Sequence, residues 1–379
     1  FLSIFVISIY TLIRYLDKKT LLNASFHAIT CALLIDVRVV GVIAPFFTVI
    51  FLCSDLLTIM IKKAKSKKIV RNLLLYLTLL IFFTMLFWPT LWQNPFYQFI
   101  KAFKIAQKFP WYDTVLYLGK YIKSTELPWH YIPVWIIIST PILYVICLFV
   151  GCFMIIKSLL INPIQYYFKH KYDLIFMLWF FLPLIGVIVS RSVLYDAWRH
   201  MFFIYPAFLI LSLIGLTYFY NVVKKINLFA LSYKNKKAIF VFIIALSLSN
   251  VIRFMVKYHP YQNVYFNILA GKNMVEIKNN FELDYWGLSY RQALEYILKK
   301  DTDKTIKICV ANFPGMLNAQ ILTPNDLLRL AYVEKPEEAK YFLSNYRWHR
   351  KEYLYKEEYY SKKVGGVRIM VVYKMNGTQ

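Results

Sequence analysis

The stretch ELPWHYIPVWIIISTPILYVICLFVGCFMII, residues 126–156, decides the fold class of this chain. From Ile132 to Ile156 it contains no Asp, Glu, Lys or Arg. A helix of about 20 apolar residues spans the hydrocarbon core of a bilayer, which is roughly 30 Å thick. We therefore expect a membrane-spanning helix here. At its N-terminal end, Trp129, Tyr131 and Trp135 are aromatic residues of the kind that settles at lipid headgroups. Pro128 and Pro133 suit the first turn of a helix.

Similar apolar stretches recur along the chain. Five more are long enough to span a bilayer: Val39–Ile61, Asn72–Trp92, Asp173–Ser190, His200–Tyr220 and Ala238–Phe254. Thr20–Ile35 is shorter, and Phe1–Ile13 is typical of the last part of another span. The composition, 59% hydrophobic and 17% charged over 379 residues, agrees with a membrane protein. We expect a polytopic α-helical membrane domain over residues 1–254, with seven to eight spans of which the first is partial.

The net charge of +25 raises the question of nucleic-acid binding, because a basic patch is the usual footprint of that function. The Lys and Arg residues instead gather in alternate short loops, over residues 14–19, 62–71, 157–171 and 224–237. Such enrichment is typical of cytoplasmic loops. We therefore expect a multi-pass protein of the plasma or inner membrane, with these loops in the cytoplasm and no nucleic-acid partner.

Three segments then fall on the outer face: a loop over residues 93–131, a turn over 190–199 and the tail 255–379. The tail contains apolar residues at helical spacing over 288–298. It also contains two β-branched and aromatic runs, Thr305–Val310 and Val367–Tyr373, which are typical of strands. We expect a small extracytoplasmic α/β domain over 255–379.

Two segments of the tail are rich in aromatic and amide side chains: HPYQNVYFN, residues 259–267, and FELDYWGLSYRQALEY, residues 281–296. Such surfaces stack on sugar rings, and they also form seams between a soluble domain and its membrane base. We favour the seam, because both segments follow the last predicted span.

Known motifs for soluble nucleotide or metal chemistry are missing from the sequence. It has no Walker loop, no GxGxxG, no GxSxG and no HExxH. The five cysteines have no zinc-ligand spacing, and we interpret them as small apolar residues. We therefore expect no cofactor and assign no residue as a metal ligand, while the sequence leaves the metal dependence of the activity open.

Several cationic residues run against the topology pattern, because they fall on the outer side. The turn SRSVLYDAWRH, residues 190–200, holds Arg191, Arg199 and His200, and Arg38 falls at the same depth if Thr20–Ile35 crosses the membrane. Arginine binds phosphate bidentately, so a cluster at the lipid boundary suits a lipid phosphate. The alternative is local pairing, of Arg199 with Asp196 and of Arg38 with Asp36.

The spans themselves have few ionisable residues near their centres, where transporters place their sites. Asp55 is the nearest exception, and we expect it to pair with Lys62 near the cytoplasmic end of its span. In the outer loop, Glu126 and His130 could touch a sugar or phosphate, or simply lie at the interface. The same loop has a helical spacing of apolar residues over 100–107 beside three lysines, which is compatible with an interfacial amphipathic helix.

Together these segments resemble the polyprenyl-phosphate-sugar-dependent membrane glycosyltransferases of the GT-C fold. These are relatives of glycosyltransferase family 39, and they include protein O-mannosyltransferase-like and aminoarabinose-transferase-like enzymes. The resemblance rests on ALLIDVRVVGVIAP (32–45), FWPTLWQNP (87–95), ELPWHYIPVWIIISTP (126–141) and YDAWRHMFFIYP (195–206), with support from the two tail segments. It implies a bundle of spans with an outer active site. The implied partners are membrane lipids, a polyprenyl-phosphate sugar, and a glycan, lipid or protein acceptor.

The resemblance also implies roles for individual residues. Arg38, Arg191, Arg199 and His200 would bind the donor phosphate, and Tyr195, His130, Glu126 and Asp113 would contact sugar or acceptor. The family's catalytic carboxylate follows the first span. Because this chain begins inside an apolar run, we expect that residue to lie upstream of it. Two alternative functions stay open, a transporter or flippase of lipid-linked substrates and a membrane-anchored assembly factor.

Overall fold

The computed structural model describes residues 1–61, 67–225 and 233–375. Contacts within the chain divide it into two compact units, each built from separate stretches. The first unit comprises Phe1–Trp111, Ile146–Val193 and Arg199–Ile226. The second comprises Tyr112–Val145, Leu194–Trp198 and Asn227–Gln379, so it draws on the predicted outer loop and outer turn as well as on the tail.

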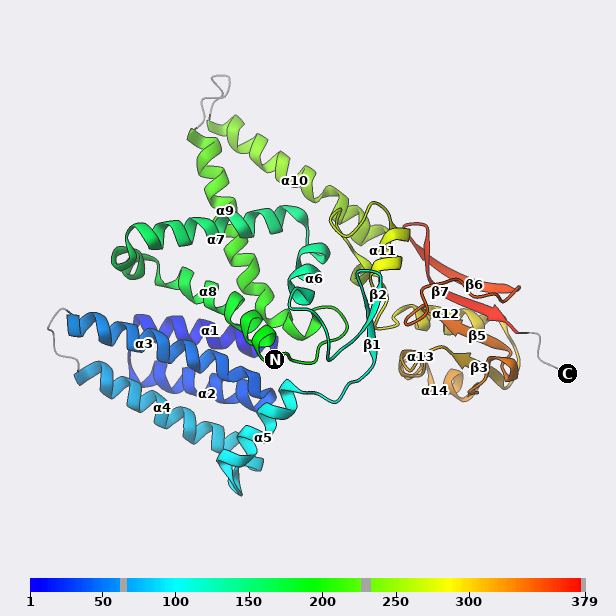
Figure 1. Ribbon diagram of the computed structural model, residues 1–379, viewed down its shortest axis with the longest axis horizontal. Coiled ribbons are helices and arrows are strands. Elements are labelled where there is room, and N and C mark those ends of the chain that lie inside the picture. Colours follow the sequence, from blue (N-terminus) through cyan, green and yellow to red (C-terminus); the bar gives the residue numbers. More distant parts are fainter. Residues whose placement is uncertain (62–66, 226–232, 376–379) are drawn as a thin grey trace. The chain divides into compact units, whose positions relative to one another are not determined.

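The first unit is helical (Figure 1). Its α-helices are α1 (Leu2–Asp17), α2 (Leu21–Val37), α3 (Ile43–Ile61), α4 (Lys67–Phe87), α5 (Pro95–Gln107), most of α7 (Ile142–Ile161), α8 (Pro163–Val189) and α9 (Tyr205–Lys225). Short 3-10 helices join some of them: η1 (Val39–Val42), η2 (Pro89–Trp92) and η3 (Arg199–Ile204). In Figure 1 the helices α1 to α4 lie side by side, and the contacts of α2 with α1 and α4 agree with this view.

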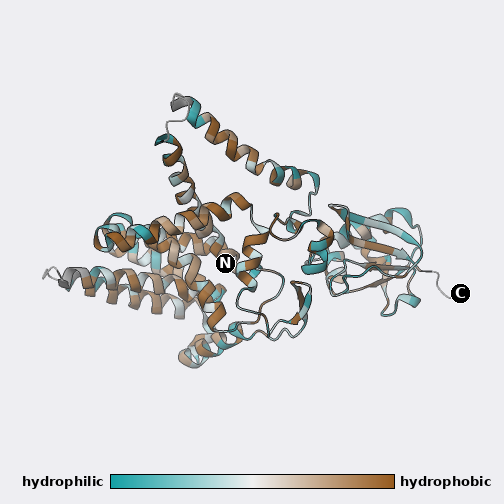
Figure 2. Cartoon of the chain, turned by 45° about the horizontal axis from the view of Figure 1, so that its top comes forward, coloured by the Kyte–Doolittle hydropathy of each residue, from teal (hydrophilic) through white to brown (hydrophobic). Residues whose placement is uncertain are grey.

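Six helices of the described residues are long and apolar enough to cross a membrane. They cover Val39–Leu57, Ile69–Phe87, Ile142–Ile161, Pro163–Val189, Arg199–Lys225 and Asn235–Lys257. Figure 2 shows the apolar colouring along these helices. The two segments that the sequence left less certain form the shorter helices α1, with 16 residues, and α2, with 17. This arrangement is compatible with a polytopic helical membrane protein.

The expected single span Ile132–Ile156 is wrong, because the helix breaks in the sequence Ser139-Thr140-Pro141. Helix α6 (Tyr131–Ser139) ends before an extended Thr140, and α7 begins at Ile142. Proline lacks an N–H group and disfavours a helical residue before it. The carbonyls left free at this break are bound by Asn267, whose Nδ2 donates to the Ile137 and Thr140 oxygens over 2.6 and 2.7 Å.

Two glycines set the approach of α7 to α9. A Cβ atom built on Gly215 would lie 1.9 Å from the Cys147 carbonyl oxygen, and one on Gly151 would lie 2.1 Å from the Leu211 oxygen. No side chain fits at these distances. Small residues of this kind let membrane helices approach closely, since packing rather than hydrophobic burial holds such helices together.

We therefore expect Gly215→Ala to destabilise the first unit by about 1–3 kcal/mol or more, because α7 and α9 must move apart. Gly186→Ala in α8 is the matched control, since nothing lies within 4 Å of the added methyl group. The measurement is the unfolding temperature of the purified chain in detergent. Equal unfolding temperatures for the two variants would contradict the proposed close approach.

A buried polar cluster lies among α1 to α4 and was missed in the sequence, where the spans were expected to be nearly free of ionisable groups. The fully buried His27 places its ring nitrogens 2.9 Å from Thr11 Oγ1 and 2.7 Å from Thr48 Oγ1. Its ring stacks on that of Tyr76. The cluster joins three helices through hydrogen bonds, as polar residues do in membrane bundles.

Asp55 has two partners among the described residues. Asp55 pairs with Lys19, with 3.0 Å between Nζ and Oδ2, and accepts a hydrogen bond from the Tyr167 hydroxyl. Lys62, the partner expected from the sequence, lies outside the described residues.

The second unit contains a small α/β sheet. Its strands are β3 (Ile306–Val310), β4 (Leu330–Tyr332), β5 (Tyr341–Ser344), β6 (Glu358–Val364) and β7 (Val367–Lys374), in the order β4-β3-β5-β7-β6. Strand β3 is parallel to β4 and β5, and β7 is antiparallel to β5 and β6. A separate hairpin joins β1 (Thr114–Tyr117) to β2 (Lys120–Lys123).

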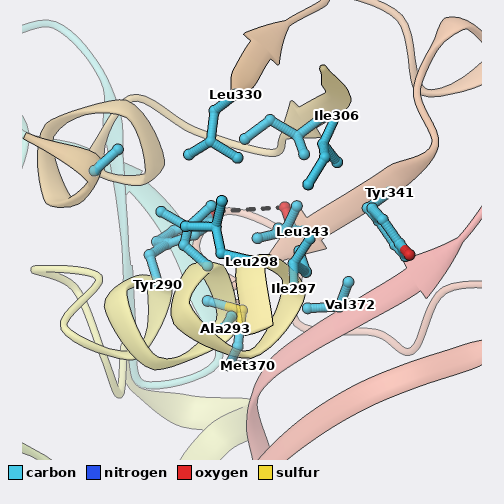
Figure 3. Packing of buried hydrophobic residues seen from close by; sticks show 13 residues of the cluster. Tyr290, Ala293, Ile297, Leu298, Ile306, Leu330, Tyr341, Leu343, Met370 and Val372 are labelled. Atoms are coloured by element: carbon cyan, nitrogen blue, oxygen red, sulfur yellow. Dashed lines mark hydrogen bonds between the residues drawn. The ribbon is translucent and has the colours of Figure 1, made fainter. Parts of the chain in front are cut away.

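Helix α12 (Ser289–Lys300) covers the sheet. Of its predicted apolar face, Ala293, Leu294, Ile297 and Leu298 are buried, whereas Leu288 is the half-buried residue that precedes the helix. Figure 3 shows Ala293, Ile297 and Leu298 in one cluster with residues of β3, β5 and β7, such as Ile306, Leu343 and Val372. The strand predictions at Thr305–Val310 and Val367–Tyr373 are thus confirmed, as is the helix over 288–298.

The remaining helices are α10 (Tyr233–Lys257), α11 (Met274–Asn280), α13 (Pro314–Ala319) and α14 (Pro324–Leu328), with two 3-10 turns, η4 (Gln262–Val264) and η5 (Pro336–Glu338).

Candidate functional site

The residues predicted to bind the donor phosphate all lie in the first unit. Arg38 is exposed and follows α2, at the start of η1. Arg191 is exposed just after α8, and Arg199 and His200 are half-buried at the start of η3. Each of these positions lies at the end of an apolar helix, and the depth of these residues in a membrane stays a prediction.

Three of these four residues form one electrostatic group. The guanidinium groups of Arg199 and Arg38 both lie close enough to the His200 imidazole to interact with it. The guanidinium carbon of Arg38 also lies 5.7 Å from the centre of the Phe1 ring. Two arginines near one histidine concentrate positive charge at the end of the apolar helices, and such a group can bind an anion.

The residues predicted to contact sugar or acceptor lie in the second unit. His130 caps the start of α6, and its Nδ1 lies 2.6 Å from the hydroxyl of Tyr117 on β1. Glu126 is exposed and lies 3.8 Å from Lys123, while Asp113 is exposed before β1. Tyr195 is half-buried. The structure therefore joins His130 to the β1–β2 hairpin and leaves the two carboxylates at the surface.

Asp196 is buried and accepts a charge-assisted hydrogen bond from Arg347. The distance from Asp196 Oδ1 to Arg347 Nη2 is 2.6 Å, and both side chains are less than a tenth exposed. Arg347 also donates from Nη1 to the Tyr285 carbonyl oxygen over 2.7 Å. A sequence separation of 151 residues kept this pair out of the sequence-based prediction.

The backbone around Asp196 is held in an unusual conformation. Asp196 and Ala197 have φ angles of 54° and 60°, in the left-handed region that costs residues other than glycine about 1–2 kcal/mol each. The Ala197 N–H donates to the buried hydroxyl of Tyr131 over 3.2 Å, and Arg347 holds the Asp196 carboxylate. These contacts join Asp196 and Ala197 to α6 and to the loop after β5, all within the second unit.

Glu282 is a third ionisable residue of this cluster, and sequence reasoning missed it. It is buried in the loop between α11 and α12, where burial and Asp196 raise the pKa of its carboxyl to about 7, although Arg347 and the Leu116 N–H act to lower it. Its Oε1 atom has no hydrogen-bond partner. Glu282 and Arg347 also line a cavity of about 20 Å³, which has room for one water molecule.

The neighbouring carboxylate, Asp284, has a structural role. It is buried, and it accepts hydrogen bonds from the Ser289 N–H and hydroxyl and from the Leu288 N–H. Asn345, which follows β5, donates to the Asp284 carbonyl oxygen and accepts from Asn312, which follows β3. The loop with Glu282 and Asp284 is thereby fixed at the carboxyl ends of the parallel strands β3 and β5. The alternation of carboxylates with apolar residues in FELDYWG, residues 281–287, is the sequence signal that could have indicated this buried loop.

The raised pKa of Glu282 predicts a pH dependence of stability. The folded chain keeps a proton on Glu282 that the unfolded chain, with a pKa near 4.5, releases between about pH 4.5 and pH 7. Stability therefore falls as the pH rises through this window, by up to about 3 kcal/mol from this group. Burial raises the pKa of Asp284 as well. Glu352 and Glu358 instead have lowered pKa values, so the stability that their ionised carboxylates contribute is lost only in more acidic solution.

The measurement is the unfolding temperature of wild type and Glu282→Gln between pH 5 and pH 8. We expect the difference between the two curves to grow with pH, because glutamine has no proton to lose. Parallel curves would contradict the assignment of this pH dependence to Glu282.

The described residues contain no group of three or more His, Cys, Asp or Glu side chains that could hold a metal ion. All five cysteines are free thiols, four of them buried and Cys53 half-buried. Comparison of the chain with protein-family models, with curated proteins and with solved structures finds no match in any of the three.

Proposed function

We propose that this chain is a membrane glycosyltransferase of GT-C type, which moves a sugar from a polyprenyl-phosphate donor to an acceptor on the outer face of the membrane. In this proposal the α/β sheet of the second unit lies outside the cytoplasm. The alternation of Lys- and Arg-rich loops along the sequence supports that orientation.

The observation that carries the proposal is the group of Arg38, Arg199 and His200 at the ends of apolar helices. A lipid phosphate has its tail among such helices and its charge at their ends. Guanidinium groups bind phosphate in two-pronged hydrogen bonds, and they do so most strongly where water is scarce. Arg38 and Arg199 act together on His200, which supports a shared binding site for one anion.

This arrangement suits the chemistry of sugar transfer. The bond that breaks joins the anomeric carbon to a phosphate oxygen, so the leaving group gains negative charge that cations can stabilise. The acceptor attacks the anomeric carbon and loses a proton, which a carboxylate must take up. Among the described residues, Asp113 and Glu126 are exposed carboxylates in the second unit, whereas Asp196 is buried and bound to Arg347.

The test uses the intact protein reconstituted in lipid vesicles with a polyprenyl-phosphate sugar that is labelled in the sugar. We expect the label to appear in a covalent product with the acceptor, together with free polyprenyl phosphate. Movement of the labelled lipid across the bilayer with no covalent product would overturn the proposal in favour of a flippase. Neither movement nor product, in a protein that retains a tightly bound protein partner, would favour an assembly factor.

A further inference from the structure

Helix α5 has no buried residue along its 13 positions. Its large apolar side chains face outward: Phe96 is 83% exposed, Ile100 53% and Phe103 45%. The neighbouring Trp92 and Phe109 are exposed as well. A water-facing helix of a soluble protein would not expose so many large apolar side chains at once.

The exposed apolar residues of α5 include one continuous face. Phe96, Ile100 and Phe103 recur at intervals of four and three, so they share one side of the helix. The exposed Lys101 and Lys104 lie along the border of this face, and Lys108 follows the helix. An exposed apolar face with lysines along its border is compatible with a helix that lies in a membrane surface, because lysine side chains can extend from such a border to the headgroups.

Both ends of α5 are fixed at the ends of long apolar helices of the same unit. Its N-terminal end follows α4 through η2, with Asn94 accepting from the Tyr97 N–H as the cap. Its C-terminal residue Gln107 donates from Nε2 to the Ser190 carbonyl oxygen over 2.8 Å, directly after α8. The Val193 N–H in turn donates to the Gln107 carbonyl oxygen. Helix α5 also contacts η1, where α3 begins.

The ends of α4 and α8 and the start of α3 thus lie around one short helix of about 20 Å. A helix bound to several span ends lies at the level where those spans leave the bilayer. We propose that α5 lies in the plane of the membrane surface, with its phenylalanines among the acyl chains and its lysines on the headgroups of anionic phospholipids. This inference does not depend on glycosyl transfer.

The test places an environment-sensitive bimane label on the apolar face, at Phe103→Cys, in a Cys53→Ser background. The other four cysteines are buried, so the label goes to the new thiol. The chain is reconstituted in nanodiscs of phosphatidylcholine and phosphatidylglycerol, in which one lipid or the other has brominated acyl chains that quench the label. We expect quenching by both lipids, and stronger quenching by brominated phosphatidylglycerol at equal mole fraction. A label at Lys299→Cys, an exposed position at the end of α12, should be quenched much less.

Charge reversal tests the headgroup contact. In the triple variant with Lys101, Lys104 and Lys108 changed to Glu, we expect the preference for phosphatidylglycerol to vanish. Each lysine near an anionic surface contributes up to roughly fivefold in affinity. The matched control changes the exposed Lys299, Lys300 and Lys304 to Glu, with the same change in net charge, and should keep the preference.

Two results would overturn the proposal. A Phe103 label that no brominated lipid quenches would show that the apolar face lies outside the acyl region, as it would if a protein partner covered it. Equal quenching by the two lipids in the unaltered lysine background would show that α5 does not select anionic headgroups.

Discussion

Replacing Arg347 with alanine should lower the stability of the chain by about 3–5 kcal/mol, because the change leaves buried carboxylates without a cation. Asp196 would lose its 2.6 Å hydrogen bond, and Glu282 would lose the attraction of Arg347 while it stays near Asp196. The Tyr285 carbonyl would lose a donor too. A loss of this size corresponds to a fall in unfolding temperature on the order of 10 °C.

The control for this prediction is Arg291→Ala. Arg291 pairs with Glu295 over 2.8 Å, but both side chains are about half exposed, so its loss should cost less than about 1 kcal/mol. The double variant Arg347→Ala with Asp196→Asn should recover part of the lost stability, because it removes the charge that Arg347 compensated. If Arg347→Ala and Arg291→Ala unfold at the same temperature, the buried pair does not hold the second unit together.

Arg199→Ala should reduce sugar transfer by about 100- to 1,000-fold if the proposed function holds, since it removes a cation from the leaving phosphate. Arg199→Lys should keep part of the activity, because lysine supplies the charge without the two-pronged geometry. The measurement is the initial rate of product formation in vesicles that contain equal amounts of inserted protein.

Arg14→Ala is the matched control for loss of a guanidinium group. Arg14 is exposed in the last turn of α1, next to the start of α2, whereas Arg38 follows the other end of α2 about 25 Å away. Its replacement should leave transfer unchanged. Normal transfer by Arg199→Ala, or an equal loss in Arg14→Ala, would remove the support for a phosphate site at the start of η3.

Hydropathy predicted most of the long helices, because a span has to be both apolar and about 20 residues long. It failed where the chain satisfies its backbone in another way. Between α6 and α7 the composition stays apolar, but Asn267, more than a hundred residues away, supplies hydrogen bonds to the free carbonyls of Ile137 and Thr140. No local pattern contains that information.

The sheet was predicted only in part for a similar reason. The β-branched runs of β3 and β7 stand out in the sequence, whereas β4 has three residues and β5 has four. Their pairing, with β3 between two parallel partners, depends on contacts over long sequence separations. Helix α12 was predictable because its apolar residues repeat at helical spacing and cover the sheet.

The candidate site shows the same limit. The grouping of Arg38, Arg191, Arg199 and His200 into one phosphate site came from their places at the ends of the expected spans, and it stays a prediction. In the structure Arg38 and Arg199 both interact electrostatically with His200. The pairing of Asp196 with Arg347 was not predictable, since a buried salt bridge has no periodicity. Glu282 was missed because a carboxylate in an aromatic segment is usually solvated, and only the fold shows that it is buried.

The phosphate site is tested by the binding of polyprenyl phosphate and of uncharged polyprenol to the purified chain in detergent. We expect the phosphate to bind much more tightly, and we expect Arg38→Ala and Arg199→Ala each to remove most of that difference while Arg14→Ala leaves it intact. Equal affinity for the phosphate and the alcohol, in wild type and variants alike, would contradict the phosphate site.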